Sequence, residues 1–146
     1  MSSVAVLGAG SWGTTFAKVL ADAGCDVTIW ARRSEVAREI HETRRNSGYL
    51  RSINLPANLD ATDSLEKALE GASQVYVAVP SQQLRDTIAI AAPLMEPDCL
   101  VISLMKGVEA LTGLRMSEVL HQAGGIDPAR IAVLSGPNLA LEIAKE

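Results

Sequence analysis

The feature that most constrains this fold is a glycine-rich turn between an aliphatic run and a segment of helical pattern. The turn reads Gly8-Ala9-Gly10-Ser11-Trp12-Gly13, with the spacing G-x-G-x-x-G, and residues 4–7 before it are all aliphatic. A second apolar run at residues 27–30 follows one helix-length later. Glycine-rich turns are common, but one that joins a strand to a helix inside a strand–helix–strand unit is typical of a dinucleotide-binding loop.

Each glycine has a distinct physical role in such a loop. Gly8 permits a tight turn, Gly10 lets backbone amides approach a pyrophosphate, and Gly13 lets the helix pack closely on the sheet. The start of the helix that follows the turn presents unpaired N–H groups and the positive end of the helix dipole. We therefore expect this loop to hold the pyrophosphate of a dinucleotide; the alternative is a structural turn.

The rest of the chain continues the alternation of apolar strands and helical segments. Short apolar runs predict strands at residues 4–7, 27–30, 75–79, 100–104 and 131–134. Near-continuous apolar strands separated by helices indicate a parallel sheet covered on both faces. The sequence thus predicts an α/β fold, a Rossmann-type doubly wound parallel sheet, as one domain over residues 1–146. Residues 46–59 form a long irregular connection, either a functional loop or a surface excursion.

Composition argues against several other classes of protein. The 17 acidic and 13 basic residues give a net charge of −4, and aromatics are only 3% of the chain, so a nucleic-acid partner is not expected. Cys25 and Cys99 are far apart and form no metal-ligand pattern, so we expect reduced cysteines and no metal. No apolar stretch approaches the roughly 18 residues of a membrane helix. The N-terminus lacks a basic signal-peptide region, and we expect a cytoplasmic protein.

The end of the second predicted strand bears on which dinucleotide is bound. A site selective for NAD usually has Asp or Glu there, to bind the ribose 2′-hydroxyl. This chain instead has Arg32 and Arg33, whose guanidinium groups suit a 2′-phosphate. We therefore expect NADP(H) to be preferred, with NAD(H) left open. The alternative is that both arginines are simply solvated before the next helix.

Polar residues follow two later strands, where a doubly wound sheet binds its ligands. Lys106, followed by Gly107, comes after the fourth predicted strand and is the only lysine between Lys67 and Lys145. A cation there could hold a substrate phosphate or polarise an oxygen, although most such lysines are only solvated. The segment Gly136-Pro137-Asn138 after the fifth strand could aim amides into the same crevice, or be a plain turn.

Together these motifs resemble the N-terminal cofactor-binding domain of bacterial NAD(P)-dependent glycerol-3-phosphate dehydrogenase. That family reduces dihydroxyacetone phosphate to sn-glycerol 3-phosphate with a nicotinamide cofactor, for phospholipid synthesis. The resemblance runs in order along the chain. It rests on Gly8-Ala9-Gly10-Ser11-Trp12-Gly13, Trp30-Ala31-Arg32, Asn46 with Tyr49-Leu50, Ala78-Val79-Pro80-Ser81, Lys106-Gly107 and Ser135-Gly136-Pro137-Asn138-Leu139-Ala140.

The resemblance implies a role for each matching position. The glycine loop with Ser11, Trp12, Arg32 and Arg33 would contact the cofactor, and Ala140 the nicotinamide end. Lys106 would lie beside both cofactor and substrate, and Gly136 and Asn138 would approach the substrate. Two positions depart from the family pattern: Arg51 stands where proline is common, and Met105 where a small residue is usual.

The resemblance also implies that the catalytic residues lie outside this chain. In the family a helical C-terminal domain supplies the catalytic lysine, so we expect no catalytic residue within residues 1–146. A helix is predicted to begin near Asn138 and to be cut at Glu146, which indicates a fragment of a longer enzyme. The partner would be a small phosphorylated substrate, and a homodimer is left open. Two alternatives remain: another two-domain oxidoreductase of the 6-phosphogluconate dehydrogenase type, or a non-catalytic NADP(H)-binding module.

Overall fold

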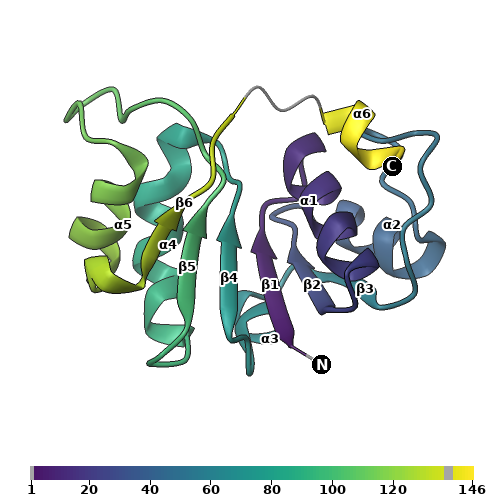
Figure 1. Ribbon diagram of the computed structural model, residues 1–146, viewed down its shortest axis with the longest axis horizontal. Helices are drawn as coiled ribbons and strands as arrows, with labels where there is room; N and C mark the ends of the chain where they lie inside the picture. Colours follow the sequence, from purple (N-terminus) through teal and green to yellow (C-terminus); the bar gives the residue numbers. More distant parts are fainter. Residues whose placement is uncertain (1, 137–139) are drawn as a thin grey trace.

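A computed structural model describes residues 2–136 and 140–146 of the chain. The described residues form a six-stranded sheet in the order β3-β2-β1-β4-β5-β6, with every neighbouring pair parallel (Figure 1). This is the strand order of a Rossmann-type doubly wound sheet, and the fold prediction is confirmed. The strands are β1 (Ser3–Leu7), β2 (Asp26–Trp30), β3 (Leu59–Thr62), β4 (Gln74–Val77), β5 (Leu100–Ser103) and β6 (Ile131–Val133).

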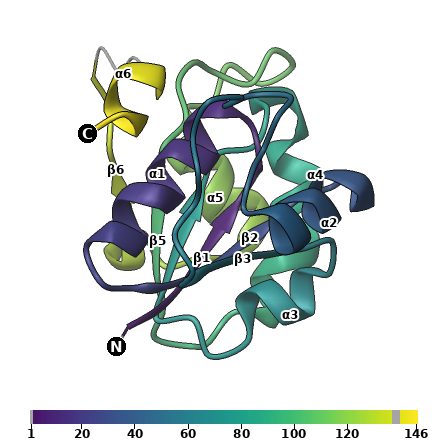
Figure 2. The same ribbon diagram turned by 90° about the vertical axis from the view of Figure 1, so that its right-hand side faces the viewer.

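Helices cover both faces of the sheet, as the view from the edge of the sheet in Figure 2 shows. The α-helices are α1 (Ser11–Asp22), α2 (Ser34–Thr43), α3 (Leu65–Leu69), α4 (Leu84–Ala91), α5 (Met116–Gly124) and α6 (Ala140–Ala144). The 3₁₀ turns are η1 (Ser81–Gln83), η2 (Ala92–Leu94) and η3 (Pro128–Arg130). In the described parts of the chain, no helix is long and apolar enough to cross a lipid bilayer.

The side chains of β1 point alternately to the two faces of the sheet and pack against the helices on each face. Val4 and Val6 are buried in a core with α1 and α2, whereas Ala5 and Leu7 are buried in a second core with α3, α4 and α5. All four are at most 1% exposed, so the strand is apolar on both faces. This double burial explains why β1 has a continuous aliphatic sequence rather than an alternating one.

The prediction of five strands was wrong by one, because β3 lies at the edge of the sheet. Its sequence is Leu-Asp-Ala-Thr, and only Leu59 and Ala61 are buried. An edge strand pairs on one side only, and here only alternate side chains reach the core. Four residues with a central Asp60 therefore give little apolar signal. The sequence predicts only an irregular connection over residues 46–59 and no strand after it, whereas β3 begins at Leu59.

The strand order determines where a ligand can bind. β1 is paired with both β2 and β4, and the chain leaves the sheet in opposite directions from β1 and β4. A crevice forms at such a switch point, beyond the carboxyl ends of the strands. The segments after β1, β2, β4 and β5 all reach this edge, and so does Tyr49 in the long connection between α2 and β3.

The β5–α5 connection, which carries Lys106, is fastened to α4 by an ion pair between the buried Glu109 and the partly exposed Arg85. The Arg85 guanidinium donates hydrogen bonds to both Glu109 carboxylate oxygens, from Nε to Oε2 and from Nη2 to Oε1, each at 2.9 Å. The Thr112 hydroxyl donates a further hydrogen bond to Oε1 at 2.6 Å, and Glu109 is only 7% exposed. The hydrogen bonds from Arg85 and then Thr112 hold the pKa of the Glu109 carboxyl below its usual value.

This ion pair makes stability depend on pH. A carboxyl with a lowered folded-state pKa stabilises the fold above its unfolded-state pKa of about 4.3, and the contribution is lost as pH falls through the lower folded value. We expect Glu109→Gln to lower the Tm at pH 7 by about 4 °C or more. The difference from the unsubstituted chain should shrink below about pH 4, as thermal unfolding scans would show. The exposed Glu96→Gln is the control; a pH-independent difference at Glu109 would contradict the assignment.

Candidate dinucleotide-binding site

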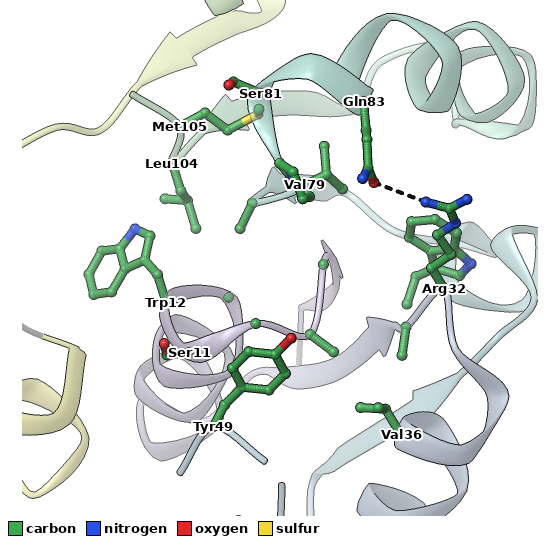
Figure 3. Close-up of a pocket in the computed structure, with 18 of the residues that line it drawn as sticks. Ser11, Trp12, Arg32, Val36, Tyr49, Val79, Ser81, Gln83, Leu104 and Met105 are labelled. Atoms are coloured by element: carbon green, nitrogen blue, oxygen red, sulfur yellow. Dashed lines mark hydrogen bonds between the residues drawn. The ribbon is translucent and has the colours of Figure 1, made fainter. Parts of the chain in front are cut away.

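A cavity of about 960 Å³ lies at the switch point of the sheet, and its walls come from five segments of the chain (Figure 3). This volume is at the upper end of the range for small-molecule and cofactor sites. Of the described residues that line it, three are basic and none is acidic. The lining comprises residues 8–13, 30–33, 78–81 and 104–106, with Val36, Tyr49 and Gln83.

The glycine loop, residues 8–13, is shaped by close approach to its neighbours at two glycines. Gly8 has φ +116°, and a Cβ atom built on it would lie 2.4 Å from the carbonyl oxygen of Ala78. A Cβ built on Gly13 would lie 2.2 Å from the Gly8 carbonyl oxygen. Neither position accepts a side chain, so the tight turn and the close helix packing expected from the sequence are present.

Gly10 differs from these two glycines because its surroundings are open. A Cβ built on Gly10 would meet no described atom within 4 Å. The residue is the N-cap of α1, and its carbonyl accepts the Thr14 N–H at 3.0 Å. N–H groups in the first turn of a helix have no intrahelical acceptor, and they carry the positive end of the dipole. The open side of Gly10 is thus a place where an anion can approach the backbone.

The side chain of Trp12 lines one end of the cavity and is packed against other aromatic rings. The Trp12 ring packs edge-on against Phe16, with centroids 5.6 Å apart, and Phe16 packs against Tyr76 at 5.2 Å. Trp12 lies at the side of the cavity opposite Arg32 in Figure 3. Its indole Nε1 is buried and has no hydrogen-bond partner among the described residues.

The opposite end of the cavity is basic. Arg32 and Arg33 follow β2 after one residue, Ala31, and are exposed at the cavity mouth. The Arg32 guanidinium donates a hydrogen bond from Nη1 to Gln83 Oε1 at 3.3 Å, which joins the segment after β2 to η1 at one side of the cavity (Figure 3). A ligand group bound beyond the end of β2 would therefore face the guanidinium groups of Arg32 and Arg33 rather than a carboxylate.

The structure brings together most of the residues predicted from the sequence. The predicted cofactor residues that line the cavity are Gly8, Gly10, Ser11, Trp12, Gly13, Arg32, Arg33 and Lys106. Their roles in binding stay predictions.

Three predicted residues are not part of this lining. Gly136 follows β6, and Ala140 begins α6, where its carbonyl accepts a hydrogen bond from the Thr15 hydroxyl at 3.3 Å. Neither is among the residues that line the cavity, and Asn138 lies outside the described residues. The proposed contacts of these three residues with substrate or nicotinamide stay predictions.

Sequence reasoning gave no site role to several residues of the cavity wall. Tyr49, from the long connection, and residues 78–81 support the resemblance but have no predicted role in the site, and Val36 is buried on the core-facing side of α2. Gln83 had no signal in spacing or composition. Met105, one of the departures from the family pattern, is 8% exposed and also forms part of the wall.

The strand order, the glycine loop at the switch point and the adjoining cavity define a Rossmann-type nucleotide-binding domain. A model of the family described as "NAD-dependent glycerol-3-phosphate dehydrogenase N-terminus" matches residues 3–146. The chain therefore belongs to this family, as the resemblance predicted. Membership in it disfavours the alternative of another two-domain oxidoreductase.

Individual relatives agree with this assignment. The chain is 62% identical over 141 residues to glycerol-3-phosphate dehydrogenase [NAD(P)+] of Leifsonia xyli subsp. xyli, covering 97% of this chain and 38% of that protein. The crystal structure of glycerol-3-phosphate dehydrogenase from Coxiella burnetii superposes with a TM-score of 0.89 at 33% identity, covering 99% of this chain and 43% of that one. The Saccharomyces cerevisiae enzyme gives 0.87 at 28% identity, covering 99% and 44%. The chain thus spans about two fifths of the length of these relatives.

Proposed function

We propose that this chain binds NADP(H) in the cavity at the switch point, as the cofactor-binding domain of an NAD(P)-dependent glycerol-3-phosphate dehydrogenase. The observation that carries the proposal is the open side of Gly10 at the start of α1, set between a basic end and an aromatic end of one cavity. A cytoplasmic location, a role in phospholipid synthesis and a homodimeric assembly stay predictions from the resemblance.

The residues present fit the parts of this cofactor. The pyrophosphate would lie against the glycine loop, where the N–H groups of α1 begin. The ribose 2′-phosphate would lie at the end of β2, where Arg32 and Arg33 offer guanidinium groups and no carboxylate opposes it. The nicotinamide would then reach the β4 and β5 side, near Met105 and Lys106.

The proposed reaction is the reduction of dihydroxyacetone phosphate to sn-glycerol 3-phosphate. A bound NADPH would supply the hydride for the ketone carbon, and a protein group would have to deliver a proton to the ketone oxygen. Lys106 is the cation of the cavity on the β5 side, and we assign it to the phosphorylated substrate and the cofactor. Because we assign the Lys106 ammonium group to binding, a second group must donate the proton. We therefore place the proton donor in residues beyond this chain.

The preference for NADP(H) can be tested by calorimetric titration with NADPH and NADH. The double variant Arg32→Ala, Arg33→Ala should weaken NADPH binding by about 100-fold or more, because each charge-assisted contact contributes about 1.5–3 kcal/mol. NADH affinity should change far less, because NADH has no 2′-phosphate.

The control for this experiment is the double variant Arg38→Ala, Arg45→Ala. It removes the same two charges from the same region, at exposed side chains that do not line the cavity. We expect it to leave the ratio of NADPH to NADH affinity unchanged. Equal affinities of the unsubstituted chain for the two cofactors, or NADPH binding indifferent to Arg32 and Arg33, would contradict the proposed preference.

A further inference from the structure

We propose that Asn46 is a positioning residue that holds the glycine loop in its binding conformation. Asn46 lies in the long connection after α2, yet it is only 1% exposed. Its side-chain amide Nδ2 donates two hydrogen bonds, one to the Ala9 carbonyl oxygen and one to the Thr14 hydroxyl oxygen, both at 2.9 Å. Its partners are 37 and 32 residues away in sequence. A buried amide with these partners ties a distant segment to the loop itself.

The bond to Ala9 controls the direction of a backbone amide at the cavity. Ala9 and Gly10 share a planar trans peptide, in which the carbonyl and the N–H point in opposite directions. An acceptor bond that fixes the Ala9 carbonyl therefore fixes the Gly10 N–H as well. Glycine has unusual rotational freedom, and no described atom lies where a Gly10 side chain would be. Gly10 has no side chain whose packing could restrain this peptide. The hydrogen bond from Asn46 to the Ala9 carbonyl supplies the restraint instead.

The bond to Thr14 extends the same restraint to the start of α1. Thr14 is fully buried, and its N–H makes the bond to the Gly10 carbonyl that begins the helix. Asn46 therefore contacts the peptide just before the N-cap and the first turn that follows it. The relative orientation of this peptide and this first turn determines where the N–H groups at the start of α1 point.

Asn46 also fixes the wall that faces the loop. Its own carbonyl accepts the N–H groups of Tyr49 at 3.1 Å and Leu50 at 2.8 Å, which closes a tight turn. Leu50 is 1% exposed and anchors this turn in the core, while Tyr49 lines the cavity. One residue thus joins the glycine loop to the Tyr49 side of the site.

Asn58 provides a matched control for a purely structural role. It lies in the same long connection, and its Nδ2 also donates two hydrogen bonds, to the Ala21 and Cys25 carbonyl oxygens at 2.8 Å each. Neither Asn58 nor these partners line the cavity. Replacing either asparagine with alanine removes the same kind of side-chain bonds, but only Asn46 contacts the loop.

The experiment, which rests on the proposed NADP(H) site, measures two ligands on this chain by calorimetry. NADPH contains the pyrophosphate, whereas adenosine 2′-monophosphate contains only the adenine, ribose and 2′-phosphate. We expect Asn46→Ala to weaken NADPH binding by about 10-fold or more, and adenosine 2′-monophosphate binding by less than about 2-fold. Asn58→Ala should leave both affinities within about 2-fold of the unsubstituted chain, even if it lowers the Tm as much.

A second variant keeps the test valid if Asn46→Ala does not fold. Asn46→Leu has a similar size and brings no charge into this buried position, but it has no N–H to donate to the Ala9 carbonyl, and we expect the same selective loss of NADPH binding. A folded Asn46 variant with unchanged NADPH affinity, or one that loses both ligands equally, would overturn this inference alone. Failure of the unsubstituted chain to bind NADPH would overturn the proposed function together with it.

Discussion

Replacing Gly10 with valine is expected to abolish NADPH binding while leaving the fold intact. A Cβ at this position meets no described atom within 4 Å, so the folded chain has room for the side chain. Gly10 is the N-cap of α1 with φ −75° and ψ −174°, an extended conformation that valine adopts readily. The branched side chain would, however, occupy the space where the pyrophosphate must approach the backbone. Calorimetry would measure the loss of binding, and circular dichroism the retained fold.

The matched variant is Gly13→Val, which should have the opposite outcome for stability. A Cβ on Gly13 would lie 2.2 Å from the Gly8 carbonyl oxygen, so the helix would have to move away from the sheet. We expect destabilisation of about 3 kcal/mol or more, typical of overpacking against backbone atoms. Retained NADPH binding in a folded Gly10→Val chain would show that the glycine loop is only a turn.

Catalysis should require more than this chain. We expect the isolated chain to bind NADPH and to reduce no dihydroxyacetone phosphate, because the resemblance places the catalytic lysine in residues beyond this chain. In a chimera with the remaining part of the Leifsonia xyli relative, Lys106→Ala should lower kcat/KM by about 100-fold or more. NADPH should still bind through the glycine loop and the arginines.

Lys67→Ala is the control for the chimera, because Lys67 is exposed on α3 and does not line the cavity. It should leave kcat/KM within about 2-fold of the unsubstituted chimera. Turnover by the isolated chain would refute the assignment of the proton donor to residues beyond it. A fully active Lys106→Ala chimera would refute the role given to Lys106.

Much of the fold and the loop could be predicted because their signals are local. The glycine spacing, the aliphatic run of β1 and the missing carboxylate after β2 all lie within the first 33 residues. Each reflects a constraint on neighbouring residues: double burial of a strand, a backbone contact without room for Cβ, or the charge at one strand end.

The parts that sequence reasoning missed depend on contacts between distant segments. Gln83 meets Arg32 across 51 residues, and Asn46 meets Ala9 across 37, so neither produces a periodic pattern. Tyr49 lies in an irregular connection whose path is set by the buried Leu50 and by the turn at Asn46. β3 was missed because an edge strand needs only alternate apolar residues.

The central claim is that the cavity at the switch point, rather than another surface, binds the cofactor. Titration of the isotope-labelled chain with NADPH, followed by NMR, tests this residue by residue. We predict that the largest amide shifts occur in residues 8–13 and at Arg32, Arg33 and Lys106. A second cavity of about 670 Å³ beside α5, lined in part by His121 and Val133, should be unaffected. Shifts concentrated at that second cavity, or no shifts at saturating NADPH, would contradict the account.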